Sequence, residues 1–176
     1  MKIFINAGHG GNDPGAVSKK GTKEKDVTRN VSSLLVYKLV QNGYNVEYYQ
    51  QEKSFTEITK AENTSNSDLF ISIHCNAADK QSANGVEVLY YPTSTRGNKC
   101  AQIVQKELVD TTNLRNRGVK ARTDLHVLKR TKAVAILVEL AFISNPEEEK
   151  LLIENPEIFA NAIYEGIENI KNQKVL

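Results

Sequence analysis

LFISIHC, residues 69–75, is an apolar run interrupted only by Ser72 and His74. A run of this kind is typical of a central strand that is buried on both faces of a sheet. KIFINA, residues 2–7, and VAILVELAF, residues 134–142, have the same character. The segments between such strands show helical periodicity. Strands that alternate with helices predict an α/β fold, a three-layer α/β/α domain with a mostly parallel central sheet flanked by helices.

The remaining predicted elements follow from periodicity and from start and stop signals. An apolar stripe from Val27 to Leu39 predicts a helix that Asn42 and Gly43 end. Asn145-Pro146 and Asn155-Pro156 are each followed by acidic residues, which is typical of a helix start. Further strands are predicted at residues 44–49, 85–91 and 126–131, further helices at about residues 56–66 and 98–114, and a basic loop at residues 115–122.

The totals limit the classes of protein to which the chain can belong. Its 176 residues suit a single catalytic domain, and the polar tail at residues 171–176 reads as the start of a linker. The net charge of +2 is too small to imply nucleic-acid binding. No apolar run has transmembrane length, so we expect no membrane insertion, and we expect a monomer. Met1 leads directly into a strand, without the pattern of a signal peptide.

Two histidines lie in equivalent positions. His9 follows the strand at residues 2–7, and His74 lies near the end of the strand at residues 69–75. Carboxyl ends of parallel strands meet at one edge of a sheet, where α/β enzymes build their sites. Strand alternation places His74 and Asn76 on one face and Cys75 on the other. Cys75 is therefore expected to be a core residue, neither a ligand nor the disulfide partner of Cys100.

A carboxylate stands alone in a third apolar strand. Glu139 shares a strand face with Ala135 and Leu137, and a buried carboxylate without a partner is costly. A metal-bound water or a nearby cation would supply that partner. The less specific alternative is a salt bridge to a lysine or arginine near the strand end. Two strand-end histidines and this glutamate together suggest a zinc hydrolase.

Catalytic zinc usually has three protein ligands, so a third ligand is needed beside His9 and His74. Glu24 lies in the first turn of the helix that follows the glycine-rich loop. Taken alone, it also fits a solvated first-turn acid that the helix dipole favours. Asp13 and His126 are rival ligands. Asp13 precedes Pro-Gly and resembles a turn former, and His126 is expected to begin a strand at the opposite edge of the sheet.

Seven motifs follow one another along the chain: GHGGNDPGA (8–16), EKD (24–26), LFISIHCNA (69–77), GVEVLYY (85–91), RNRGVK (115–120), VLKRT (127–131) and VELAFISNPEE (138–148). In this order they resemble the motifs of the zinc-dependent N-acetylmuramoyl-L-alanine amidases of type 3, which occur in bacterial autolysins and phage endolysins. The resemblance covers nearly the whole chain and implies a twisted, mixed sheet with helices on both faces. It also implies that His9, Glu24 and His74 bind one Zn²⁺ and that Glu139 is the catalytic carboxylate.

The same resemblance implies a substrate and a place of action. The expected reaction is hydrolysis of the amide between the lactyl group of N-acetylmuramic acid and L-alanine of the peptidoglycan stem peptide. Asn76 is a candidate substrate contact, and Arg117 and Arg122 are candidates for stem-peptide carboxylates, although solvated loop charges explain both arginines as well. Action at the bacterial cell wall is expected, either as a released phage or mother-cell enzyme or as a domain of an exported protein. A carboxypeptidase acting within the stem peptide and a non-catalytic wall-binding module remain the alternatives.

Overall fold

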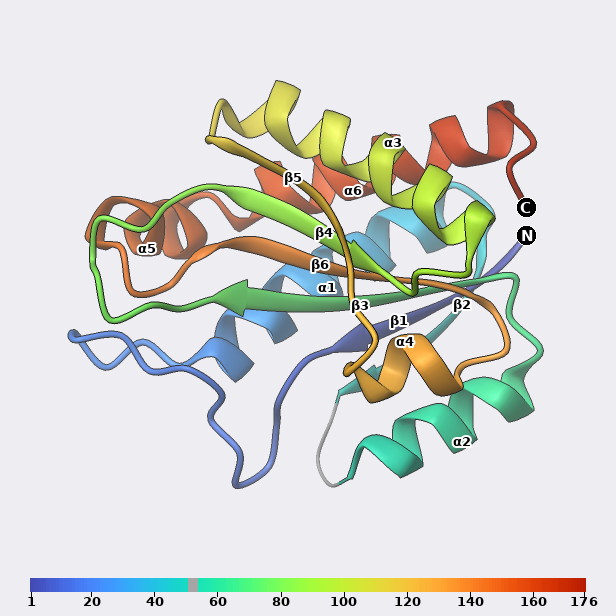
Figure 1. The fold of residues 1–176 in the computed structure, drawn as a ribbon, viewed down its shortest axis with the longest axis horizontal. Coiled ribbons are helices and arrows are strands. Elements are labelled where there is room, and N and C mark those ends of the chain that lie inside the picture. Colours follow the sequence, from blue (N-terminus) through green and yellow to red (C-terminus); the bar gives the residue numbers. More distant parts are fainter. Residues whose placement is uncertain (51–53) are drawn as a thin grey trace.

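The computed structural model describes residues 1–50 and 54–176 and contains a mixed central sheet (Figure 1). Its strand order is β2-β1-β3-β6-β4-β5, and neighbouring strands are parallel except for the antiparallel pair β4 and β6. The predicted mostly parallel, mixed sheet is thereby confirmed. The strands are β1 (Lys2–Ala7), β2 (Asn45–Gln50), β3 (Leu69–Asn76), β4 (Val86–Tyr90), β5 (Asn116–Ala121) and β6 (Val134–Phe142).

Helices cover both faces of the sheet, which confirms the three layers (Figure 1). α1 (Glu24–Gln41), α3 (Thr95–Thr112) and α6 (Pro156–Asn172) pack on one face, and α2 (Phe55–Ser65) and α4 (His126–Arg130) pack on the other. α5 (Pro146–Glu154) follows the end of β6. Ile71 and Ile73 of β3 enter the core beneath α1, α3 and α6, whereas Phe70 enters the core beneath α2 and α4. Both faces of β3 are thus buried, as its apolar run predicts.

Two predicted elements are wrong. The expected loop at residues 115–122 contains strand β5, and the expected strand at residues 126–131 is the short helix α4. β5 is an edge strand that is half-buried at residues 117–120 and exposed at both ends, and its register against β4 shifts near Gly118, which has a φ of +79°. Such a strand shows no apolar alternation in sequence. In α4 only Val127 and Leu128 are buried, and two adjacent apolar residues do not distinguish a helix from a strand.

The C-terminal helices begin as predicted. The Asn145 side chain accepts hydrogen bonds from the backbone N–H groups of Glu147 and Glu148, while Asn155 makes no such side-chain bond. In the tail, α6 continues to Asn172, and Val175 and Leu176 pack against the core. Among the described residues, none of the helices combines the length and apolar character needed to span a membrane.

Candidate metal centre

Three predicted ligands meet at one edge of the sheet. His9 follows β1, His74 lies on the neighbouring parallel strand β3, and Glu24 is the first residue of α1. One ligand atom from each lies within 4.8 Å of the others. Glu24 Oε1 is 3.1 Å from His74 Nδ1, and Glu24 Oε2 is 3.3 Å from His9 Nε2. Two imidazole nitrogens and a carboxylate form a ligand set that suits a first-row metal ion.

The His9 ring is held in place by its own loop. His9 has a φ of +60°, a left-handed conformation that is uncommon for a residue with a side chain. Asp13 Oδ2 lies 2.8 Å from His9 Nδ1, and Asp13 Oδ1 accepts a hydrogen bond from the Gly15 N–H at 3.0 Å. Asp13 is therefore outside the ligand cluster and orients His9, so that Nε2 faces Glu24. Metal-binding histidines commonly have such a carboxylate on their other nitrogen.

The glycines of the loop leave room for the ligands. A Cβ at Gly8 would lie 2.2 Å from Cε1 of His74, and a Cβ at Gly15 would lie 2.6 Å from Oε2 of Glu24. Gly15 also has a φ of +65°, which favours glycine. Glycine at positions 8 and 15 thus follows from the close approach of the backbone to the cluster.

Glu24 is a buried anion, only 4% exposed. Its Oε1 accepts the Cys75 N–H and its Oε2 accepts the Ala16 N–H, both at 2.9 Å. Burial raises the pKa of Glu24, but hydrogen bonds to His74 and His9 outweigh burial, so the pKa lies well below its usual range. Burial likewise lowers the pKa of His9, but Glu24 and Asp13 raise it to about 9. The cluster therefore favours positive charge between its carboxylate and its imidazoles, which a divalent cation supplies.

A second buried glutamate anchors the loop that leads to Glu24. Glu149 of α5 is 3% exposed, and its Oε1 accepts hydrogen bonds from Ser18 Oγ at 2.5 Å and from Thr22 Oγ1 at 2.6 Å. These contacts fix residues 18–22 against α5, just before α1 begins. The helix that carries Glu24 is therefore held at its start from outside the metal cluster.

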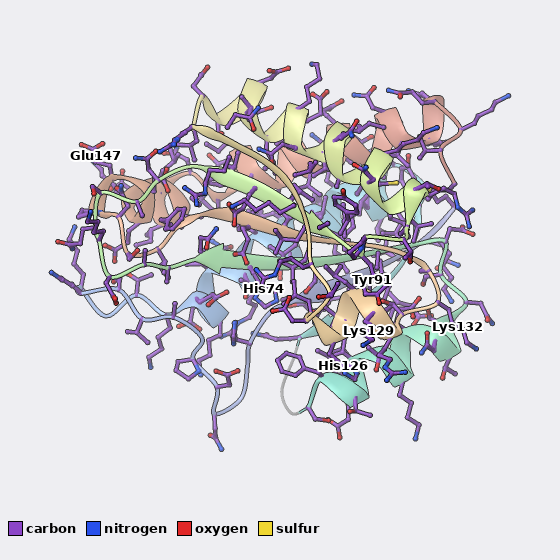
Figure 2. The ribbon with its side chains drawn as sticks, viewed as in Figure 1. His74, Tyr91, His126, Lys129, Lys132 and Glu147 are labelled. Carbon is purple, nitrogen blue, oxygen red and sulfur yellow. The ribbon has the colours of Figure 1, made fainter. Side chains whose placement is uncertain are left out.

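Replacing this anchor is expected to weaken the fold. Glu149→Ala removes two hydrogen bonds to a charged acceptor, and we expect it to lower the free energy of unfolding by about 3 kcal/mol. Urea-induced unfolding measures the change. Glu147→Ala is the matched control, because Glu147 lies in the same first turn of α5 but is exposed (Figure 2). Equal stability of the two variants would contradict the anchoring role.

Glu139 lies beside the cluster on the next strand. It is in register with His74 across β3 and β6, and its Oε2 is buried. Within residues 1–50 and 54–176 that oxygen has no hydrogen-bond partner, so the alternative of a salt bridge to a lysine or arginine finds no support. Burial raises the pKa of Glu139 to about 7, a value suited to accepting and then donating a proton.

The other candidate residues lie apart from the ligand cluster. His126 begins α4, and its Nε2 is 3.3 Å from Thr59 Oγ1 of α2, in a groove of about 540 Å³ between these helices. Figure 2 shows His126 well separated from His74. Arg122 forms an exposed ion pair with Asp124. Cys75 is buried on the α1 side of the sheet, and both cysteines are free, as expected.

Asn76 and Arg117 lie near Glu139. Asn76 shares the face of β3 with His74, and its buried Nδ2 has no hydrogen-bond partner in the described part of the chain. Arg117 is on β5 and donates from Nε to Glu87 Oε2 at 2.7 Å. Sequence reasoning missed Glu87 and its second partner, Lys120, although Glu87 carries the signal that identified Glu139: it is a single acid in the apolar run GVEVLYY.

Comparison with known proteins places this site in a family. Residues 3–169 match the model of the Amidase_3 family, described as N-acetylmuramoyl-L-alanine amidase. The uncharacterized protein YqiI of Bacillus subtilis is 34% identical in an alignment of 180 positions that covers 97% of this chain and 85% of YqiI. N-acetylmuramoyl-L-alanine amidase LytC of the same organism is 34% identical in an alignment of 155 positions that covers 85% of this chain but only 31% of LytC.

The fold comparison agrees. The crystal structure of an N-acetylmuramoyl-L-alanine amidase from Clostridium difficile 630 superposes with a TM-score of 0.90 and 30% identity, covering 98% of this chain and 97% of that one. The family match spans most of the chain and includes the three ligand candidates and Glu139. The chain therefore belongs to the Amidase_3 family of N-acetylmuramoyl-L-alanine amidases.

Proposed function

We propose that this chain is a zinc-dependent peptidoglycan amidase. It hydrolyses the amide between the lactyl group of N-acetylmuramic acid and L-alanine of the stem peptide, at the bacterial cell wall. The observation that carries the proposal is the cluster of His9, Glu24 and His74, with Glu139 on the adjacent strand, whose Oε2 has no hydrogen-bond partner among the described residues. The name of LytC, which contains a similar domain, supports the same bond as the target.

The two parts of the site have different tasks. His9, Glu24 and His74 hold one zinc ion, and the bound ion supplies Lewis acidity towards water and towards the amide carbonyl. Asp13 fixes the tautomer and orientation of the His9 ring by its 2.8 Å contact to Nδ1. These residues therefore establish the charge of the site and take no part in proton transfer.

Glu139 moves the proton. Its Oε2 accepts a proton from the attacking water as the carbon–oxygen bond forms at the lactyl carbonyl. The same oxygen then donates that proton to the leaving nitrogen of L-alanine, so that the carbon–nitrogen bond breaks with a neutral amine as product. One carboxyl group serves both steps because the proton that it receives is the proton that the amine needs.

Digestion of purified peptidoglycan tests this assignment. We expect new free amino termini on L-alanine and intact muramic acid, identified by mass analysis, and no digestion in the presence of a chelator. A carboxypeptidase acting within the stem peptide would instead release carboxyl-terminal amino acids. A wall-binding module would bind the polymer and release nothing. Either of these results would refute the proposed function.

A further inference from the structure

A row of polar, titratable side chains crosses neighbouring strands and starts at the metal cluster. His74 on β3 is in register with Glu139 on β6, and Glu139 is in register with Glu87 on β4. Glu87 Oε2 in turn accepts hydrogen bonds from Lys120 Nζ at 2.5 Å and Arg117 Nε at 2.7 Å, both from β5. The row thus continues from the ligands past Glu139 to two cations at the edge of the sheet.

The row lies on the face of the sheet that α2 and α4 cover, at the end nearest the metal ligands. Val86 and Val88 of β4 belong to the core beneath α1, α3 and α6, so Glu87 between them points to the other face. On that other face Leu89 and Leu137 pack in the core beneath α2 and α4. Glu87 and Glu139 lie two residues further along the same strand faces, towards the edge where the ligands meet. Both glutamates therefore lie at the end of the face that is nearest the metal cluster.

Glu87 is a buried carboxylate that binds both Lys120 and Arg117 and fixes their positions. It is 7% exposed, and although burial opposes its charge, the hydrogen bonds from Lys120 and Arg117 hold its pKa below the usual range. Arg117 is fixed further, because Nη1 donates to the Asn84 carbonyl at 3.3 Å and the guanidinium lies 4.8 Å from the centre of the Phe142 ring. Both cations are therefore held in place, which lowers the entropy cost of binding an anion.

Among the described residues, Arg117 and Lys120 have N–H groups that remain free to bind a ligand. Arg117 and Lys120 retain 26% and 41% side-chain exposure, and in the described part of the chain they share one hydrogen-bonded carboxylate. Glu148 also acts electrostatically on Arg117, but its oxygens accept the N–H groups of Gly85 and Phe142 at 2.6 Å. The remaining N–H groups of Arg117 and Lys120 are thus available to an acidic group beside Glu139.

We propose that Arg117 and Lys120 bind a carboxylate of the stem peptide, on the leaving-group side of the scissile amide, with Glu87 as a positioning residue. This inference rests on the proposed function. Neighbouring strands are about 4.8 Å apart, so the cations that reach Glu87 lie roughly 5–10 Å from Glu139 along the row. An extended peptide advances about 3.5 Å per residue. A carboxylate on the second or third residue of the leaving peptide matches that span.

The test uses two soluble muramyl peptides that differ only in one group. The carboxylate of the residue after L-alanine is free in one peptide and amidated in the other. Lys120→Gln and Arg117→Gln are each expected to lower kcat/KM for the free acid about 10-fold or more, mainly by raising KM. For the amidated peptide the same variants should change kcat/KM less than about 3-fold. Lys106→Gln, an exposed lysine of α3 paired with Asp110, is the control and should alter neither value.

Glu87→Gln tests the positioning role. The amide keeps an acceptor oxygen but loses the charge that holds both cations, so preference for the free acid should fall while zinc content stays at the parent level. Equal losses on the two peptides in the Lys120, Arg117 and Glu87 variants would overturn the carboxylate site. A parent enzyme that cleaves neither peptide nor peptidoglycan would instead refute the proposed function. Lys120→Gln keeps the test decisive if Glu87→Gln does not fold, because Lys120 is 41% exposed.

Discussion

Glu139→Gln is expected to retain the zinc content of the parent protein and to lose nearly all amidase activity. The substitution keeps the shape of a side chain whose Oε2 has no hydrogen-bond partner in the part of the chain that the structure describes, so the fold and the three ligands should be left intact. It removes the group that takes the proton from water and returns it to the leaving amine. Loss of a general acid–base residue typically costs about 10²–10⁴-fold in rate.

Release of new amino termini from peptidoglycan measures the rate, and atomic absorption measures the zinc. Glu165→Gln is the control, since Glu165 is an exposed glutamate of α6. Turnover by Glu139→Gln at near the parent rate would show that another group moves the proton. Loss of zinc from this variant would show that Glu139 acts on the metal and not on the substrate.

His9→Ala is expected to lose both the metal and the activity. The change removes one of three ligands and leaves the buried carboxylate of Glu24 with a single imidazole partner. Loss of a metal-orienting partner alone typically costs 10–100-fold in affinity, and loss of a ligand costs more. Zinc titration of the metal-free protein therefore measures an affinity at least about 100-fold below that of the parent.

The third histidine provides a matched control for this experiment. His126→Ala removes an imidazole that contacts Thr59 between α2 and α4, remote from the cluster. It should bind zinc as the parent does and remain active. If the His9 variant bound zinc stoichiometrically with parent affinity, the three-residue ligand set would be wrong. If the His126 variant lost zinc instead, His126 of α4 would have to be counted among the zinc ligands.

Much of the fold was predictable because its central strands are buried on both faces. β1, β3 and β6 appear in the sequence as long apolar runs, and the titratable side chains His74 and Glu139 stand out against them. The strand alternation that separates His74 from Cys75 is a local property of the backbone. The structure confirms these strands and these faces.

Contacts between distant segments were not predictable in this way. Glu24 looks like an ordinary first-turn acid from its neighbours in sequence, and it was assigned through the family resemblance. Asp13 looked like a turn former, and it does bind the Gly15 N–H, but its contact with His9 depends on a left-handed residue within the loop. Single-residue backbone conformations of this kind leave little trace in composition.

The sequence alone determined that two histidines and a lone glutamate lie on or just after buried strands, because burial and alternation depend on each strand's own residues. Only the tertiary structure decided what surrounds them. Glu87, Lys120 and Arg117 meet because the edge strand β5 pairs with β4 through a shifted register, and Glu149 reaches Ser18 across most of the chain. Hydrogen bonds between charged groups depend on which strands become neighbours, and that choice belongs to the packed sheet as a whole.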